Sequence, residues 1–328
     1  MNPGTREPVD RAYQASRQAL AYRHRHEQGV LQVTGGDRLT WLNGLLTNDV
    51  LTSGGDRYAA WLTPQGRMIT DMFVVSNDES TWLEVPAPLT QSLAQRLDGL
   101  IFAEDARVED VSAGLLPLEI VGPAAEHGVD AVKRALAGHG DFSIPVRLVE
   151  QPARGAVLYV PRSIDDDAIA ALTESGAVPM DDETAEIMRV EAGVPRFLVD
   201  MNEETIPLEA GLDHAISHTK GCYVGQEIIV RIRDRAHGRV ARHLVGLLLE
   251  GPAVPAADQP VLVDGRPVGR LTSAVRSVAL GQPIALATLH RDHVSPGRPV
   301  TLSDGTVGTV AALPFVPPAS PDRTAPTG

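Results

Sequence analysis

Hydrophobic and polar residues along the first third of the chain predict strands that alternate with short helices. Residues 29–34, 57–63, 67–76 and 81–85 are rich in β-branched and aromatic side chains, which favours strands. The Pro-Gln-Gly segment at 64–66 predicts a hairpin between the second and the third of them. Leucines at helical spacing predict a helix after Asp37, which would be its N-cap, and a second helix covers 89–97. This order is typical of an α+β unit.

A second α+β block follows, with a break near residue 114. Strands are predicted at 115–121, 146–149 and 156–160, and helices at 123–136, 164–174 and 181–192. Ser163 and Asp166 have the spacing of a capping box for the second of these helices, and Gly193 ends the third. The two blocks together form an α+β region over residues 1–237.

The pattern changes after residue 238. Short strands are predicted at 240–249, 260–263, 268–275, 284–289, 299–302 and 307–313, and Asp-Gly pairs at 264–265 and 304–305 are strong turn signals. Short strands without helices predict a small β-barrel over 238–313. Residues 314–328 contain five prolines and are predicted to be a disordered tail.

Composition narrows the possible functions. The 328 residues include 42 acidic and 29 basic side chains, a net charge of −13, which argues against a general nucleic-acid binder but leaves room for a local basic patch. The single cysteine, Cys222, excludes an intramolecular disulfide and a four-thiolate zinc or iron–sulfur site in one chain. No apolar run approaches the roughly 18 residues that cross a membrane, and there is no leader, so we expect a cytoplasmic protein without membrane contact.

Several common catalytic motifs are absent from the sequence. It contains no Gly-x-Gly-x-x-Gly after a strand, no phosphate-binding loop and no His-Glu-x-x-His. His214 and His218 are four residues apart, but no third ligand follows at a suitable spacing, so no metal site is predicted. His218 could instead polarise the thiol of Cys222.

The most distinctive segment is Lys-Gly-Cys-Tyr-Val-Gly-Gln-Glu at 220–227. Its two glycines permit a tight turn and a close approach of the backbone to a ligand. Lys220 would favour the thiolate form of Cys222 if the two side chains face each other. The alternative is a buried cysteine that only packs. We predict that Cys222 and Lys220 are the catalytic pair.

This octet resembles the Lys-Gly-Cys-(Phe/Tyr)-x-Gly-Gln-Glu signature of the YgfZ branch of the folate-binding, aminomethyltransferase-like superfamily of the glycine cleavage T-protein. Segments 42–50, 66–68, 189–195, 207–212 and 269–273 resemble other motifs of that superfamily. The resemblance covers residues 28–313. It implies two partly intertwined α+β subdomains around a central folate channel, followed by the C-terminal β-barrel.

The resemblance also implies which residues bind the cofactor, tetrahydrofolate or a derivative. Glu191 lies where the superfamily has a carboxylate that binds the pterin ring, a task that suits two parallel N–H bonds. Asp71 remains where aminomethyltransferases have an acidic pair, although it could also face solvent from a strand. Since Thr70 replaces the other acid, we expect no useful glycine-cleavage activity. Four further residues are assigned to the folate: Tyr223, Gln226, Glu227 and Arg231.

Five arginines follow the octet, at 231, 233, 235, 239 and 242. On a strand the first three would share one face. Such a stripe could hold the glutamyl tail of folate, an acidic partner protein or RNA, or it could be a solvated hinge between domains.

The YgfZ-type resemblance implies a tetrahydrofolate-binding accessory factor for the assembly or maintenance of iron–sulfur enzymes, including those that modify tRNA. Its partners would then be reduced folate and iron–sulfur enzymes or their assembly proteins, and it would not be a classical enzyme. One alternative is an aminomethyltransferase of the glycine-cleavage type, a one-carbon transferase that takes an aminomethyl group from a lipoyl carrier protein. Another is a folate- or tRNA-binding module without catalysis.

Overall fold

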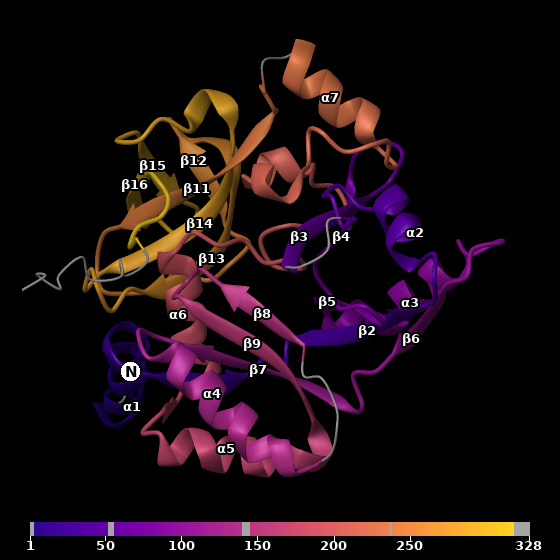
Figure 1. Ribbon diagram of the computed structural model, residues 1–328. Helices are drawn as coiled ribbons and strands as arrows, with labels where there is room; N and C mark the ends of the chain where they lie inside the picture. Colours follow the sequence, from indigo (N-terminus) through magenta and orange to yellow (C-terminus); the bar gives the residue numbers. More distant parts are fainter. Residues whose placement is uncertain (1–2, 52–55, 140–144, 236–237, 318–328) are drawn as a thin grey trace, which may run out of the picture.

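The computed structural model describes residues 3–51, 56–139, 145–235 and 238–317. These residues form two five-stranded sheets and a closed six-stranded barrel, with helices on both sheets (Figure 1). This confirms the predicted fold class, α+β with a C-terminal β-barrel.

The first sheet is made by the hairpin-rich N-terminal block, in the order β3-β4-β5-β2-β6. Helices α2 (Arg38–Leu45) and α3 (Thr90–Asp98) supply the apolar side chains that cover one of its faces. The other face bears polar and aromatic side chains, because side chains alternate along each strand. The strands are β2 (Gln28–Thr34), β3 (Asp56–Leu62), β4 (Met68–Ser76), β5 (Ser80–Pro86) and β6 (Arg107–Asp110).

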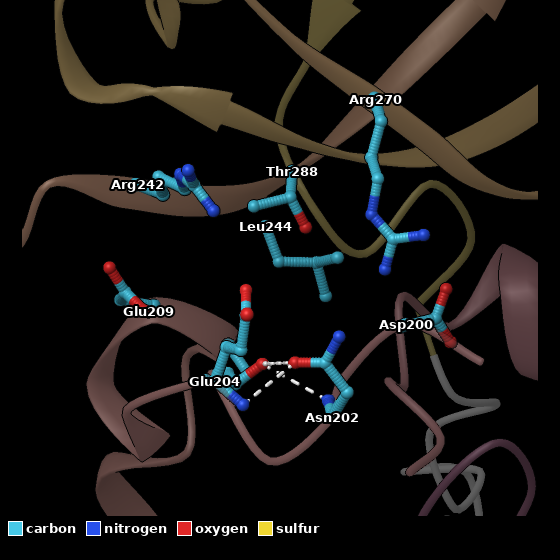
Figure 2. Close-up of a pocket in the computed structure, with 10 residues that line it drawn as sticks. Asp200, Asn202, Glu204, Glu209, Arg242, Leu244, Arg270 and Thr288 are labelled. Carbon is cyan, nitrogen blue, oxygen red and sulfur yellow. Dashed lines mark hydrogen bonds between the residues drawn. The ribbon is translucent and has the colours of Figure 1, made fainter. Parts of the chain in front are cut away.

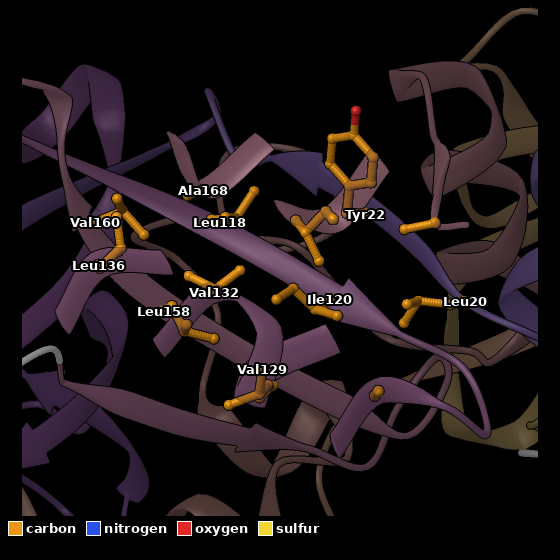
Figure 3. Packing of buried hydrophobic residues seen from close by; sticks show 14 of the residues in the cluster. Leu20, Tyr22, Leu118, Ile120, Val129, Val132, Leu136, Leu158, Val160 and Ala168 are labelled. Carbon is orange, nitrogen blue, oxygen red and sulfur yellow. The ribbon is translucent and has the colours of Figure 1, made fainter. Parts of the chain in front are cut away.

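The second sheet has the order β10-β1-β7-β9-β8. Figure 3 shows its core, where Leu118 and Ile120 of β7 lie close to Val129 and Val132 of α4. Strand β1 comes from the N-terminus yet pairs with β7, so the chain passes through the second subdomain before it builds the first. The elements are β1 (Ala21–His24), β7 (Leu115–Val121), β8 (Val146–Val149), β9 (Gly155–Pro161), β10 (Val178–Pro179), α4 (Ala125–Leu136) and α5 (Asp165–Glu174).

The N-terminal helix α1 (Pro3–Gln18) was not predicted from the sequence. Its buried residues Val9, Ala12 and Tyr13 have the helical i, i+3, i+4 spacing, so the signal was present. Figure 1 places α1 beside the second sheet, and it packs with α6 (Asp182–Glu191) in one apolar cluster. Strand β1, also missed, has only four residues.

The barrel closes in the order β11-β14-β13-β12-β15-β16, with β11 pairing with both β14 and β16. Leucines such as Leu247, Leu271 and Leu289 fill its interior. The predicted turn at Asp264 and Gly265 has positive φ at both residues, as a tight hairpin turn requires. The strands are β11 (Arg242–Leu249), β12 (Pro260–Val263), β13 (Arg266–Arg276), β14 (Pro283–His290), β15 (Pro299–Leu302) and β16 (Val307–Ala311).

Of two predicted helix caps, one is confirmed in position and one is wrong. Asp37 is the N-cap residue of α2, as predicted, but it makes no cap hydrogen bond, and its carboxylate accepts from the backbone N–H of Asp105 instead. The N-cap of α5 is Ile164, so Ser163 lies before the cap position. Asp181, by contrast, caps α6 through the backbone N–H of Thr184.

The remaining helices are short, apart from α7 (Gln226–Arg235). The break near residue 114 falls between β6 and β7. At the C-terminus Phe315 packs against the cluster that joins α1, α6 and the barrel, whereas residues 318–328 of the predicted tail lie outside the described part of the chain. The 3-10 helices are η1 (Ala87–Leu89), η2 (Ala137–His139), η3 (Arg162–Ile164), η4 (Pro207–Ala210), η5 (Asp213–Ala215) and η6 (Arg291–His293).

Candidate functional site

The face of the first sheet that α2 and α3 leave uncovered carries a cluster of polar and aromatic side chains. Phe73 of β4 is paired with Tyr58 of β3 on one side and with Glu84 of β5 on the other. Asp71 lies two residues before Phe73, so it is on the same face. This face meets β8 and β9 of the second sheet, where Arg147 and Tyr159 contact Glu84.

Glu84 joins the two sheets from a fully buried position. Its carboxylate accepts from Arg147 at 3.2 and 3.3 Å and from the Tyr159 hydroxyl at 2.7 Å, and Arg25 lies 3.0 Å away. Burial alone would raise the pKa of Glu84, but the guanidinium groups of Arg147 and Arg25 outweigh it and hold the pKa below its usual value. The carboxylate therefore stays charged and fixes the spacing of the sheets.

Asp71 lies beside this network and is only partly buried. The hydroxyl of Tyr58 donates to its Oδ2 at 2.5 Å. Burial raises the pKa of Asp71 to about 6, although the hydrogen bond from Tyr58 acts in the opposite direction. A carboxyl group that titrates near neutrality can take up or release a proton during a reaction, which is what a general acid or base must do.

Tyr58, the hydrogen-bond partner of Asp71, lies between two other aromatic rings. Tyr58 is stacked on His214 with ring centroids 5.4 Å apart, and its ring lies 4.7 Å from that of Phe73. The Arg147 guanidinium is 3.7 Å from the Phe73 centroid, a cation–π contact that holds the ring in place. Burial lowers the pKa of His214, which favours a neutral ring. The cluster of Tyr58, Asp71, Phe73 and His214 thus combines flat apolar surfaces with one protonatable carboxyl group.

From its spacing to His218, His214 was considered only as a possible metal ligand. Its observed neighbour is the Tyr58 ring, and His218 is exposed. Among the residues that the structure describes, no group of three metal-ligating side chains is found. Tyr58 was missed, although its distance from the turn at residues 64–66 places it across the predicted hairpin from Phe73.

Lys220 has a different neighbourhood from the one predicted. Its ammonium group donates to the backbone oxygens of Asn43, Leu46 and Asn48 at 2.6, 2.7 and 2.9 Å, at the end of α2 and in the turn after it. These carbonyls are the acceptors that a helix end leaves free. Burial lowers the pKa of Lys220 to about 8. All three of its N–H donors are used by carbonyl groups.

Cys222 is exposed, whereas the next residue, Tyr223, is buried. The Tyr223 ring centroid lies 5.3 Å from the Lys220 ammonium group, and burial raises the pKa of Tyr223 to about 12. Gly225 has φ of +83°, and a Cβ there would lie 2.5 Å from the carbonyl oxygen of Thr63. The octet therefore needs a glycine here to pack against the β3–β4 turn. The catalytic role assigned to Cys222 and Lys220 stays a prediction.

The arginine stripe lies partly on helix α7, so the shared face that a strand would give does not form. Arg231 and Arg233 both belong to α7, where residues two apart point to different faces. Arg231 is exposed, and Arg233 pairs with Asp234 at 2.7 Å. Figure 1 places α7 at the periphery, away from β8 and β9. Gln226 and Glu227 begin this helix, so their assignment and that of Arg231 to folate stay predictions.

Glu191 is buried at the junction of α1, α6 and the barrel. Its carboxylate accepts from the Tyr13 hydroxyl at 2.5 Å, from the Ser277 hydroxyl at 2.6 Å and from the Ala279 backbone N–H at 3.2 Å. These three protein donors give Glu191 a structural role at the junction. The predicted pterin contact of Glu191 stays a prediction, and it would have to replace some of these bonds.

The fold and this site define a three-part protein with a protonatable carboxylate between two α+β subdomains and a barrel beside them. A family model described as the GCVT N-terminal domain matches residues 3–142, and the glycine cleavage T-protein C-terminal barrel domain matches residues 242–317. The aminomethyltransferase of Moorella thermoacetica is 30% identical over 316 residues, 88% of this chain and 84% of that protein. The aminomethyltransferase of Streptomyces avermitilis is 28% identical, covering 82% of this chain and 78% of that protein.

The chain belongs to the glycine cleavage T-protein (aminomethyltransferase) family. A crystal structure of the glycine cleavage system aminomethyltransferase T from Bartonella henselae superposes with a TM-score of 0.79 at 19% identity, over 94% of this chain and 89% of that one, which shows the shared fold.

These comparisons correct the predicted function. The relatives above are named aminomethyltransferases and match over most of this chain, which overturns the prediction of an accessory factor for iron–sulfur enzymes. The alternative inferred from the sequence, an aminomethyltransferase of the glycine-cleavage type, is the better supported one. Among the described residues no helix is both long and apolar enough to cross a bilayer.

Proposed function

We propose that this protein is an aminomethyltransferase that uses tetrahydrofolate. The relatives named for that activity support the reaction class. The observation that carries the proposal here is the Tyr58–Asp71 hydrogen bond, which places a carboxyl group with a pKa of about 6 among aromatic rings.

The residues of this cluster fit a reduced folate. The pterin ring is a flat nitrogen heterocycle with N–H donors, so aromatic faces and a carboxylate acceptor are the groups that would hold it. Tyr58 and His214 would contact the ring, and Asp71 would accept its N–H groups. When bound, tetrahydrofolate supplies the nitrogen atoms that receive the one-carbon unit.

The protein's own contribution is to position groups and to handle a proton. Asp71 takes up or releases a proton at its carboxylate, while Tyr58 fixes the orientation of that carboxylate through Oδ2. The Glu84–Arg147 contact holds the second sheet against this site and keeps Phe73 in place. The donor of the aminomethyl group, inferred from the family resemblance, is a lipoyl carrier protein.

A reconstituted assay tests the proposal. The protein would be mixed with an aminomethylated lipoyl carrier protein and tetrahydrofolate, and the release of ammonia would be followed. We expect turnover at enzyme-like rates, and a loss of roughly 10²–10⁴-fold in Asp71→Asn, the range of general acid–base catalysis. Asp130→Asn, an exposed substitution on α4, is the matched control and should keep full activity. No turnover by the wild-type protein would refute the proposed reaction.

Membership in the YgfZ-type branch is a finer proposal that the octet at 220–227 supports. It rests on Lys220, Cys222 and the two glycines of the octet, and it adds no group to the Asp71 site. Cys222 has no role in the proposed reaction. The aminomethyl-transfer assay therefore tests the reaction without depending on whether the protein belongs to the YgfZ-type branch.

A further inference from the structure

A charged cleft separates the barrel from the loop that leads to η4. The barrel side of the cleft, here called the barrel wall, is lined by side chains that strand pairing brings together. Thr288 of β14 pairs with Leu244 of β11 and with Arg270 of β13. Arg242 pairs with His290 one row further along, on the same face. Figure 2 shows Arg242 and Arg270 on this wall, with Glu204 and Asn202 on the loop below.

The cleft is large enough for a small molecule. The cavity between wall and loop has a volume of about 70 Å³, and a neighbouring cavity of about 410 Å³ is lined by the same Arg242, Arg270 and Thr288 together with His290 and His293. The neighbouring cavity falls within the roughly 300–1,000 Å³ that sites for small ligands commonly measure. Leu244 adds an apolar surface between the two arginines (Figure 2).

The charges on the two sides of the cleft do not neutralise each other. Arg242 and the carboxylate of Glu204 both line the cavity, yet within the described ranges neither has an ion-pair or side-chain hydrogen-bond partner. Arg270 has one nitrogen bonded to Asp258 and keeps its other donors. The backbone hydrogen bonds of the 202–205 turn fix the loop, so Glu204 is held opposite the wall.

Other acids near the cleft are already engaged. The Asp200 carboxylate is buried and bonded to Arg189, Thr272 and Ser273. One oxygen of Glu209 accepts from the backbone N–H of Ile206. Arg270 is paired with Asp258, so among the described residues of the cleft the charges without an ion pair are Arg242 on the barrel wall and the carboxylates of Glu204 and Glu209 on the loop side.

We propose that this cleft binds a small zwitterion of the α-amino acid class. The carboxylate of the ligand lies between Arg242 and Arg270, where guanidinium groups can donate two parallel hydrogen bonds. Its ammonium group faces Glu204, and its side chain lies on Leu244. The site uses none of the residues of the Tyr58–Asp71 cluster, so this proposal does not depend on the proposed aminomethyl transfer.

Titration calorimetry with L-leucine tests the site, because two analogues of the same skeleton each lack one charge. Isopentylamine lacks the carboxylate, and 4-methylpentanoate lacks the ammonium group. We expect L-leucine to bind the intact protein at least about tenfold more tightly than either analogue, because each charged hydrogen-bonding group contributes that much or more.

Two variants assign the charges to their residues. In Arg242→Gln the affinity for L-leucine should fall to that for isopentylamine, and in Glu204→Gln it should fall to that for 4-methylpentanoate. Both residues are exposed, so folding should be unaffected, and a melting curve checks this. Arg266→Gln is the matched control, since Arg266 is exposed on β13 but does not line either cavity.

Three results would overturn the proposal. The first is that L-leucine does not bind at concentrations up to about 10 mM, a range that includes weak small-ligand sites. The second is that the two analogues bind as tightly as L-leucine. The third is that Arg266→Gln loses as much affinity for L-leucine as Arg242→Gln and Glu204→Gln do. Aminomethyl transfer is measured separately, so its success or failure is read independently of this site.

Discussion

Removing one hydroxyl group tests whether Tyr58 controls the protonation of Asp71. In Tyr58→Phe the ring still packs between His214 and Phe73, but the 2.5 Å hydrogen bond to the carboxylate is lost. That bond stabilises the charged form of Asp71 and therefore lowers its pKa. Burial raises the pKa, and the Tyr58 hydrogen bond is the largest of the effects that lower it, so without that bond the pKa should rise above the present value of about 6.

The size of the shift follows from the bond's strength. A hydrogen bond to a charged group contributes about 1.5–3 kcal/mol, and one pKa unit corresponds to about 1.4 kcal/mol, so the pKa of Asp71 should rise by about one to two units. At pH 7 the ionised fraction would fall from about 90% to between about 10% and 50%. If the reaction needs the carboxylate, the acid limb of the rate profile moves up by the same one to two units.

The assay is the pH dependence of kcat for aminomethyl transfer in the wild-type protein and in Tyr58→Phe. Tyr22→Phe, which removes a tyrosine hydroxyl from the second sheet, is the control and should leave the profile unchanged. A merely structural role of Tyr58 would lower the rate equally at every pH. An acid limb at the same pH in both proteins would therefore refute the reasoning.

Three further predictions concern stability and the octet. Arg147→Met should lower the free energy of unfolding, measured by urea titration, by about 3–5 kcal/mol, because it leaves Glu84 buried beside fewer cations. The double variant Glu84→Leu/Arg147→Met should recover most of that loss. Lys220→Met should cost roughly 1–3 kcal/mol for each part-buried carbonyl that stays without a donor, measured in the same way; a loss below about 0.5 kcal/mol would contradict its capping role. Cys222→Ser should keep kcat within about twofold, since the exposed thiol has no part in the proposed reaction, and a loss on the scale of general acid–base catalysis would instead support a catalytic role of Cys222.

Much of the architecture could be predicted because it rests on local patterns. The hairpin of β3 and β4 and the strands of the barrel follow from alternation and from turn residues such as Asp264 and Gly265. The missed helix α1 carries its signal in Val9, Ala12 and Tyr13, but its arginine-rich polar face concealed the short apolar stripe. Such a stripe becomes decisive only when a partner surface, here α6, is known.

The contacts of the site could not be predicted in the same way, because they join distant parts of the chain. Lys220 is two residues from Cys222, and this proximity suggested a catalytic pair. In the structure Lys220 bonds instead to a carbonyl 177 residues away, at Asn43. Proximity in sequence does not decide where a long side chain points, since the nearest strong acceptors are set by the fold.

Asp71 and the packing of the two sheets depend on the same residues. Burial and the Tyr58 hydrogen bond have the largest effects on the pKa of Asp71, and the network that holds the sheets together adds smaller ones, because the charge of Glu84 raises this pKa and Arg25 lowers it. Arg147 contributes to both, because it bonds to Glu84 and holds the Phe73 ring beside Tyr58. The ion network between the two sheets therefore lies next to the carboxyl group that the proposed chemistry uses, and its buried charges act on that group as well as on the packing of the sheets.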